Sequence, residues 1–357
     1  MLFNNMTQKE VSMLSRTVLS ILIIAVWLIL VAANPSYAQE SFYKGKTFTF
    51  VVGASPGGGF DVYTRIIARY MSKYIPGSPS ILVQNMTGAG TLIAANHTYG
   101  RANPDGLTIG VWVGSLTLQK YLGATSITFD PMKFEWIGVP VQQTFVCAFT
   151  KASGITSMDK WFGASRPVKI GGQAPGTRLD DIPMILKTAL GLPVQLIQGY
   201  KGTADVVLAA DSGEVDGICT SWQGTKTSWR RQIESGNAVV VLQTNPKSIP
   251  ELSNVPLAIN FAKSEEARRL IQVGIHDVNA VTLAYSAPPG TPKDRVQTLR
   301  KAFQATLKDP EFLVDAKKAD LEVDPMTGEE LQTTIAGFQK LPPQVVARLK
   351  EILLPKN

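Results

Sequence analysis

The chain has 357 residues, of which 45% are hydrophobic and 18% are charged. This composition supports one large or two medium domains with hydrophobic cores and argues against a disordered chain. The formal net charge of +7 is spread along the sequence, and no basic run carries interleaved aromatic side chains. Nucleic acid is therefore not an expected partner, whereas a mildly cationic body favours a small anionic ligand.

The N-terminus has the pattern of a secretory signal. Lys9 and Arg16 give a basic start, residues 18–33 form an apolar run, and Ala38 ends a short stretch with small side chains. We predict cleavage after Ala38 and a periplasmic location for the rest of the chain. An uncleaved N-terminal membrane anchor is the alternative. Either outcome exports the remaining residues, in which no other segment has the pattern of a membrane span.

Strands and helices alternate in the first part of the exported chain. A run rich in β-branched and aromatic residues predicts a strand over 47–52, and apolar side chains at helical spacing predict a helix over 61–74. A short strand at 81–83 precedes a glycine loop and a helix that ends near 102, and another strand covers 108–113. Strand, glycine loop and helix in alternation indicate a parallel α/β sheet.

The same alternation returns later in the chain. Further strands are predicted over 168–171, 194–197, 215–219 and 239–243. Glycine-containing loops follow the first three of them and open helices, two of which are predicted over 180–189 and 203–210. From residue 263 onward the chain is predicted to be mostly helical, with one strand over 281–285.

Two such blocks predict an α/β protein of two lobes that face a ligand cleft. Ligands in open α/β sheets bind beyond the carboxyl ends of the strands, where the glycine loops lie. We assign residues 1–38 to the signal peptide, 41–140 and 241–357 to lobe 1, and 141–240 to lobe 2. Strands or short crossings are expected to join the lobes.

Cys147 and Cys219 are the two cysteines of the chain. An exported protein permits a disulfide, but the spacing leaves a disulfide and two buried thiols equally open. Two histidines and two distant cysteines do not match the spacing of a zinc cluster. No metal site and no cofactor are predicted.

A possible nucleophile elbow is the first candidate for chemistry. Gly53, Ser55 and Gly57 form the G-x-S-x-G pattern between a predicted strand and a predicted helix. The elbow needs the backbone N–H of the residue after the serine for its oxyanion hole, and Pro56 has none. The candidate bases, His97 and His276, lie in no motif and are better explained as solvated or core residues. We therefore predict no catalytic residues.

An anion-binding loop explains the same stretch better. A helix N-terminus exposes unpaired N–H groups and partial positive charge, and glycines let an anion approach that backbone closely. In this hypothesis Pro56 fixes the turn, residues 57–59 expose their amides, and Asp61 caps the helix. Similar loops in both halves of the chain would aim several helix N-termini into one cleft and hold a carboxylate there.

Short motifs in a fixed order connect the chain to a known family. They are FYKGK (42–46), PGGGFD (56–61), N with GAG (85 and 88–90), PDG (104–106), GT (176–177), YKG (200–202), GEVD (213–216), APPGTP (287–292) and DPEF (309–312). With these motifs, residues 42–333 resemble the periplasmic receptors of tripartite tricarboxylate transporters, the Bug family.

The resemblance implies a type II periplasmic-binding-protein fold, with two α/β lobes, a central ligand cleft and a hinge of crossing strands. It also implies a small organic acid as the ligand and a two-component membrane permease as the partner. Family members hold a carboxylate largely by main-chain amides and waters in the loops that match residues 55–59 and 172–177. The predicted ligand-binding residues are Ser55, Pro56, Gly57, Gly58, Gly59, Gly88, Gly90, Gln173, Gly176, Thr177, Arg178, Tyr200 and Trp222.

Some positions depart from the family pattern. Met86 and Thr87 follow Asn85 where relatives often have Arg-Pro, and no histidine stands three residues after Gly176-Thr177. Arg178 would pair with a second carboxylate, since its guanidinium fork suits that group, or stay solvated in the first helical turn. Trp112, Tyr200 and Trp222 would stack on a ligand ring or pack the lobes, with Trp222 the best candidate for stacking.

These observations predict an exported, non-enzymatic receptor for an organic acid, which closes about a hinge, needs no cofactor and works as a monomer. Two other classes stay open at this point. One is a secreted serine hydrolase that uses Ser55. The other is a receptor that signals through a sensor partner instead of feeding a permease.

Overall fold

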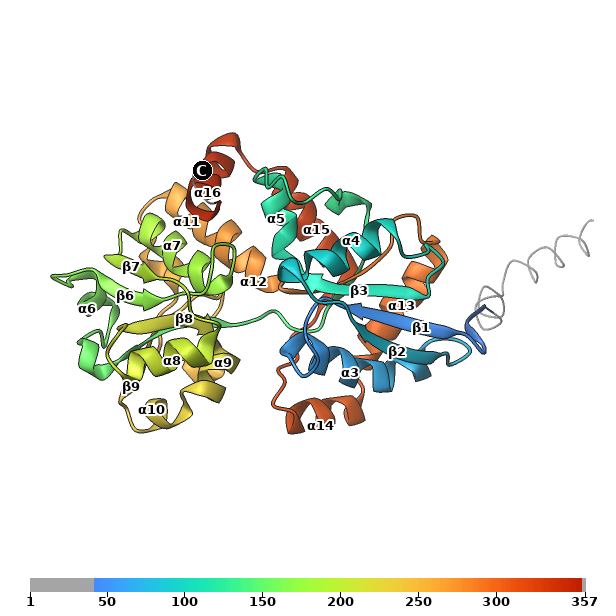
Figure 1. Cartoon of the computed structure of the whole chain (residues 1–357), viewed down its shortest axis with the longest axis horizontal. Helices are drawn as coiled ribbons and strands as arrows, with labels where there is room; N and C mark the ends of the chain where they lie inside the picture. Colours follow the sequence, from blue (N-terminus) through green and yellow to red (C-terminus); the bar gives the residue numbers. More distant parts are fainter. Residues whose placement is uncertain (1–41, 355–357) are drawn as a thin grey trace, which may run out of the picture.

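The computed structural model describes residues 42–354 and shows two lobes side by side, each built on one β-sheet (Figure 1). The predicted signal peptide, residues 1–38, lies outside the described residues. Within residues 42–354, the helices are all too short or too polar to cross a membrane. The mixed α/β architecture with two lobes confirms the predicted fold class.

The first lobe contains a six-stranded sheet in the order β11-β4-β10-β3-β1-β2. Its strands are β1 (Thr47–Val52), β2 (Ser80–Asn85), β3 (Thr108–Val113), β4 (Glu135–Val139), β10 (Leu283–Ala287) and β11 (Met326–Thr327). β1 pairs in parallel with β2 and β3, whereas β10 runs antiparallel to β3 and β4. The carboxyl ends of β1, β2 and β3 therefore lie at one edge of this sheet.

The second lobe repeats this plan in a five-stranded sheet with the order β7-β6-β8-β5-β9. Its strands are β5 (Phe145–Thr150), β6 (Val168–Gly171), β7 (Val194–Ile197), β8 (Gly217–Ser221) and β9 (Ala238–Gln243). β6 is the central parallel strand, with β7 and β8 beside it, and β5 runs antiparallel to β8 and β9. β6 thus corresponds to β1, and β5 corresponds to β10.

Helices follow the parallel strands of both sheets. In the first lobe they are α3 (Gly59–Met71), α4 (Leu92–Gly100) and α5 (Ser115–Tyr121). In the second lobe they are α7 (Arg178–Leu190), α8 (Thr203–Asp211) and α9 (Trp222–Ser228). The remaining α-helices are α6 (Met158–Phe162), α10 (Arg230–Glu234), α11 (Glu265–Ile271), α12 (Val278–Ala280), α13 (Lys293–Thr306), α14 (Pro310–Lys318), α15 (Gly328–Gln339) and α16 (Pro343–Leu353). Short 3₁₀ turns cover Ser72–Tyr74, Ala89–Thr91, Pro131–Lys133, Lys151–Ser153, Pro250–Leu252 and Ala258–Phe261, and a π-helical turn covers Gln272–Asp277.

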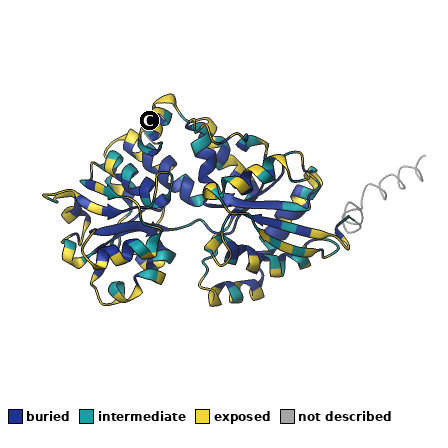
Figure 2. Cartoon of the chain, viewed as in Figure 1, coloured by how far each residue is buried: buried dark blue, intermediate teal, exposed yellow. Residues whose placement is uncertain are grey.

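The cores lie between the sheets and these helices, and the outward helix faces are exposed (Figure 2). The helix predicted over 61–74 begins earlier, at Gly59, and its α-helical part ends at Met71. It buries Tyr63, Ile66 and Ile67, which recur at helical spacing. This burial against the sheet explains why the segment is a stable helix although it begins at a glycine and two more glycines precede it.

The chain crosses between the sheets at 140–144, from β4 to β5, and again between β9 and β10. The lobe boundaries stay a prediction, but two helices beyond residue 241 pack against the second lobe. α11 and α16, assigned to lobe 1 from the sequence, both contact α7 of the second lobe. The cause is apolar packing, since Ile185 of α7, Leu270 of α11 and Leu349 of α16 belong to one buried hydrophobic cluster.

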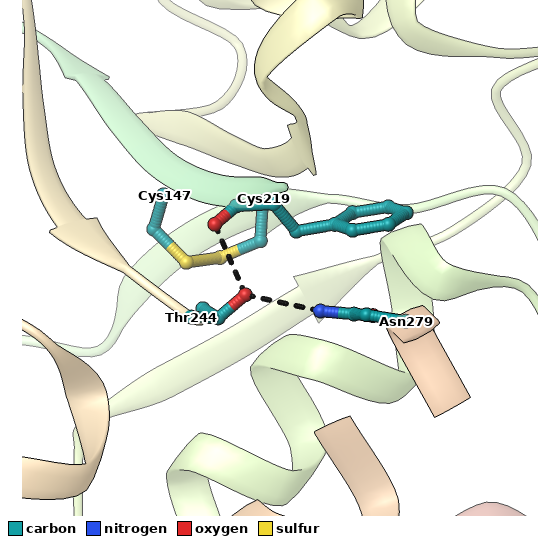
Figure 3. The surroundings of a disulfide bond; sticks show 5 residues. Cys147, Cys219, Thr244 and Asn279 are labelled. Atoms are coloured by element: carbon teal, nitrogen blue, oxygen red, sulfur yellow. Dashed lines mark hydrogen bonds between the residues drawn. A yellow bond between two sulfur atoms is a disulfide. The ribbon is translucent and has the colours of Figure 1, made fainter. Parts of the chain in front are cut away.

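A disulfide joins Cys147 of β5 to Cys219 of β8 (Figure 3). The two residues lie directly opposite each other in the antiparallel pair. This finding decides the question that the cysteine spacing left open. Both side chains are fully buried, so the bond lies within the hydrophobic core of the second lobe.

Candidate functional site

Three loops of the first lobe meet beyond the carboxyl ends of β1, β2 and β3. Asn85, at the end of β2, donates from Nδ2 to the carbonyl oxygen of Ala54 at 2.8 Å and to Asp61 Oδ1 at 2.9 Å. Thr91 Oγ1, in the loop after β2, accepts from the backbone N–H of Val113 at 3.0 Å. Hydrogen bonds therefore join the loop after β1 to the end of β2, and the loop after β2 to the end of β3.

The loop after β1 is the predicted anion-binding loop, and it is open to solvent. Ser55, Pro56, Gly57 and Gly59 are exposed, and Gly58 is half-buried. The N–H of Gly58 donates to the carbonyl oxygen of Ser55 at 3.1 Å and closes a turn. Gly57 has a φ of +79°, a conformation that a residue with a side chain adopts only with strain.

The N-terminus of α3 has no side-chain cap. Its N-cap residue is Gly58, and no side chain bonds the first amides of the helix. Asp61 was predicted as the cap, but its Oδ2 accepts instead from the loop amide of Gly57 at 2.8 Å. The reason is its place as the third helical residue, from which the carboxylate reaches back to the loop. The first amides of α3 consequently remain available to an external acceptor.

Asp61 is 2% exposed but paired. Arg65 Nε donates to its Oδ2 at 2.9 Å. Burial alone would raise the pKa of Asp61, but the hydrogen bonds from Arg65, Gly57 and Asn85 outweigh it and lower the pKa. The negative charge beside the loop is thus offset by Arg65, and the partial positive charge of the helix N-terminus is left for a ligand.

The loop after β2 is strained. Four consecutive residues have positive φ: Gly88 (130°), Ala89 (47°), Gly90 (58°) and Thr91 (75°). Such a conformation is costly for Ala89 and Thr91, and strain of this kind concentrates at binding sites. Gly88 and Gly90, two of the predicted site residues, are the members of the run that carry no such cost.

The second lobe has a matching loop after β6. The N–H of Gln173 donates to Asp180 Oδ1 at 2.6 Å, and the hydroxyl of Thr177 donates to the carbonyl oxygen of Ala174 at 2.8 Å. Gln198, in the loop after β7, also donates to Asp180. Thr177 is the N-cap residue of α7, and its hydroxyl contacts Asp180 Oδ1 at 3.3 Å but accepts no helix amide. The N-terminus of α7 therefore resembles that of α3.

The two lobes come close at this loop. Gly176 has a φ of +85°, and a Cβ built on it would lie 3.2 Å from Gln119 Nε2. Gln119 belongs to α5 of the first lobe, so the first lobe reaches the glycine loop of the second. Of the predicted residues, Gln173, Gly176 and Thr177 share this loop, whereas residues 55–59, Gly88 and Gly90 belong to loops of the first lobe.

Arg178 lies elsewhere than predicted. It is 8% exposed, and its guanidinium donates to Asn279 Oδ1 and to the carbonyl oxygens of Gly274 and Ile275. The solvated alternative is wrong, because the side chain turns inward against the π-helical turn. Its donors are occupied by the protein, so Arg178 is not part of the ligand site that we propose.

Tyr200 and Trp222 are held by protein contacts. Tyr200 donates its hydroxyl to Glu214 Oε1 at 2.6 Å, and Trp222, which is 7% exposed, donates from Nε1 to Glu251 Oε2 at 2.6 Å. Trp222 also packs against Val146 and Leu252. These contacts match the packing alternative, and a stacking role for Tyr200 or Trp222 stays a prediction.

Ser55 and the two histidines do not form one group in the described residues. Within residues 42–354, no hydrogen bond joins Ser55 to His97 or His276, and no group of acidic, histidine and cysteine side chains could hold a metal ion. His276 is 8% exposed, and burial lowers its pKa to about 4. It lines a cavity of about 380 Å³ beside the two crossings, together with Thr144 and Asn279.

Comparisons with known proteins agree with this architecture. The family model described as the tripartite tricarboxylate transporter family receptor matches residues 63–349. A UPF0065 protein from Cupriavidus necator is 24% identical over 322 residues, which cover 89% of this chain and 92% of that protein. Since the matched region spans almost the whole described chain, the similarity extends to both lobes.

Solved structures share the fold at low identity. A TctC solute-binding protein from Polaromonas, without ligand, has a TM-score of 0.66 at 16% identity and covers 87% of this chain and 98% of its own. MatC from Rhodopseudomonas palustris, with bound malate, has a TM-score of 0.59 at 19% identity and covers 86% of this chain and 99% of its own. Another R. palustris protein, solved with adipate, has a TM-score of 0.62 at 21% identity and covers 86% of this chain and 98% of its own.

Proposed function

Since the chain belongs to the tripartite tricarboxylate transporter receptor family, we propose that it captures a small organic acid between its lobes and delivers it to a membrane permease. The family is one of solute-binding proteins and not of enzymes. A periplasmic location, reached by the secretory signal at residues 1–38, is part of this proposal, as is a monomeric state.

The uncapped N-terminus of α3, with its exposed glycine loop, is the observation that carries the proposal. Its first amides lack both an intrahelical partner and a side-chain cap. A carboxylate placed there would accept several N–H bonds and interact favourably with the helix dipole. Glycine at 57, 58 and 59 removes the side chains that would keep the ligand from the backbone.

The second lobe supplies the opposing surface in this proposal. Its glycine loop, residues 172–177, lies at the uncapped start of α7 and within reach of Gln119 from the first lobe. When the lobes close on a ligand, water leaves the space between them, and each amide–carboxylate bond becomes stronger in the lower dielectric. Binding and closure would thus favour each other.

The bound ligands of two structural neighbours guide the choice of acid. Malate and adipate, seen in the two R. palustris proteins, are both dicarboxylates of few carbons. The shared fold makes a compact dicarboxylate a reasonable first probe. We infer the class of the ligand, an organic acid, from the main-chain amides of the two loops, which recognise the carboxylate group rather than the carbon chain.

Thermal melting against a panel of acids tests the proposal. The predicted mature protein, residues 39–357, is melted with malate, adipate, tricarboxylates, aromatic acids and amino acids, and with the matching esters or amides. A binding acid at ~100 times its dissociation constant should add about 2.7 kcal/mol to the free energy of unfolding. A shift with one acid class and none with its ester supports the proposal, and equal shifts with acid and ester contradict it.

The hydrolase alternative is tested with the same protein. Ser55 is followed by Pro56, which has no N–H for an oxyanion hole, and neither histidine bonds to it. Ester turnover that disappears in Ser55→Ala would contradict the receptor proposal. Delivery is tested separately by uptake into vesicles that carry the permease, and a receptor that binds the acid without promoting uptake points to the sensor alternative.

A further inference from the structure

Arg178 connects the glycine loop of the second lobe to the segment that crosses between lobes. It is the first residue of α7 and follows directly after the loop at residues 172–177. Its Nε and Nη2 donate to Asn279 Oδ1 at 3.0 and 2.6 Å. Its Nη1 donates to the carbonyl oxygen of Gly274 at 3.1 Å, so one guanidinium bonds both the π-helical turn and α12.

Asn279 extends these contacts to the end of β9. Its Nδ2 donates to Thr244 Oγ1 at 3.5 Å, and that hydroxyl donates to the carbonyl oxygen of Phe145 at 3.0 Å. Figure 3 shows Thr244 between Asn279 and the disulfide that joins β5 to β8. Thr244 directly follows β9, and Phe145 begins β5, so the chain of bonds reaches the second-lobe ends of both crossings.

The crossing that contains Asn279 also bonds the first lobe. The N–H of Gly114, at the turn from β3 into α5, lies 3.2 Å from the carbonyl oxygen of Val281 and 3.4 Å from that of Thr282. A Cβ on Gly114 would lie 2.2 Å from the Val281 oxygen, so only glycine permits this approach. A continuous series of contacts thus runs from the loop at 172–177, through Arg178 and Asn279, to α5 of the first lobe.

We propose that Arg178 is a positioning residue, which fixes the ligand loop at 172–177 to the crossing segment and transmits the effect of a bound ligand to the angle between the lobes. It does not touch the ligand. The claim that Arg178 transmits the effect of a ligand rests on the proposed function. The claim that Arg178 fixes the loop rests only on its contacts. The guanidinium of Arg178 bonds acceptors in both the π-helical turn and α12. The planar fork of arginine is essential for this, because the ammonium group of lysine does not reproduce its geometry.

The test compares Arg178→Lys with a matched change at a second buried arginine. Arg300 is also 8% exposed, and its Nε donates to the carbonyl oxygen of Trp136 at 2.7 Å, but it lies in α13 of the first lobe. Arg300→Lys therefore controls for the loss of a buried guanidinium fork away from the crossing. Amide hydrogen exchange is measured across residues 172–177 and 274–282 in wild type and both variants, without ligand.

Arg178→Lys should speed exchange in both segments by about tenfold relative to Arg300→Lys, since it leaves buried acceptors without their charged donor. Equal exchange of these segments in the two variants overturns the inference. Asn279 provides a second variant pair should Arg178→Lys fail to fold. Asn279→Asp keeps an acceptor for Arg178 and should exchange more slowly at 172–177 than Asn279→Ala, and equal rates in this pair also overturn the inference.

Binding of malate and adipate to the same proteins tests the ligand-dependent part. If wild type binds either acid, Arg178→Lys should weaken it by about tenfold and Arg300→Lys by less than about twofold. Equal affinities of the two variants would overturn the claim that Arg178 transmits the effect of a bound ligand. If wild type binds no acid from the full panel, the proposed function fails, and the exchange rates still decide whether Arg178 fixes the loop.

Discussion

Asp61 and Asp180 hold the same position in the two lobes. Each is the third residue of the helix that follows the central parallel strand, and each accepts the amide proton of a loop residue, at 2.8 Å from Gly57 and at 2.6 Å from Gln173. Asp205, the third residue of α8, does the same for Lys201 at 3.1 Å. The carboxylates thus hold the shape of the loops, and the helix amides are left without a side-chain cap.

Asp61→Asn should destabilise the protein in a pH-dependent way. The variant loses the charged bond to Arg65, which is worth about 1–3 kcal/mol at pH 7. Because the folded pKa of Asp61 is lowered, its contribution is present above the ordinary pKa of about 4 and is lost as the pH falls through the folded pKa. Denaturant unfolding at several pH values measures the difference from wild type.

The control for this prediction is Asp159→Asn. Asp159 is an exposed acid in the first turn of α6. It should change stability by less than about 0.5 kcal/mol, as surface substitutions usually do. A stability difference for Asp61→Asn that persists unchanged at pH 3 would contradict the assigned role of its charge.

Gly176→Ala should reduce both stability and ligand affinity. Its φ of +85° costs alanine about 1–2 kcal/mol, and the added methyl would lie 3.2 Å from Gln119 Nε2 of the other lobe. Gly191, at the C-terminus of α7, has a φ of +70° and open space around its Cβ position. Gly191→Ala should lose similar stability but keep its affinity for the acid found by thermal melting. Equal affinities in the two variants would show that residue 176 lies outside the ligand site.

Two ion pairs join the lobes, and their loss should favour a more open arrangement. Lys226 of α9 lies 3.4 Å from Glu322, and Arg230 of α10 lies 3.7 Å from Asp320. The first pair is half-buried and the second is exposed, and surface pairs of this kind each contribute roughly 0–1 kcal/mol and are screened by salt. We expect Glu322→Gln to widen the interlobe distance distribution at low salt, measured between paired spin labels.

High salt should remove most of that difference between Glu322→Gln and wild type. Glu351→Gln is the control, because Arg348 and Glu351 pair at 2.6 Å within one helix, α16. An interlobe distance distribution that widens equally in both variants, or that does not change with salt concentration, would contradict an ionic contribution to closure.

Removal of the disulfide should cost stability and leave the solute site formed. Cys147 and Cys219 are 72 residues apart, and a loop of that length corresponds to about 4 kcal/mol of chain entropy in the unfolded state. The double variant Cys147→Ala/Cys219→Ala should therefore melt well below wild type. Because both sulfurs are buried, mild reductant should not lower the melting temperature of the folded wild type within minutes, and an immediate drop would contradict that burial.

Much of the fold could be predicted from local patterns. β1, β3, β6 and β7 begin and end at the predicted residues, because short apolar runs with a glycine within two residues of their ends mark them. β8 and β10 begin two residues later than predicted, at Gly217 and Leu283, where the sheet registers and not the local composition set the boundary. β4 and β5, the strands on either side of the first crossing, were not predicted.

The candidate site could be predicted only in part from the sequence. The glycine loops are a local signal, and the structure places them at the carboxyl ends of parallel strands as expected. The contacts of Arg178 with Asn279 and Gly274 join residues about a hundred positions apart, and no local pattern predicts them. The same holds for Gln119, which reaches Gly176 from the other lobe.

The central claim is that main-chain amides of the two glycine loops hold a carboxylate, and amide NMR shifts test it most directly. The acid that stabilises the protein most is titrated into deuterated, ¹⁵N-labelled protein, with its ester as the control. We predict that the largest acid-specific shifts fall on residues 57–60 and 172–177. Shifts that are the same with the ester, or that leave both loops unchanged while the acid binds elsewhere, would contradict the claim.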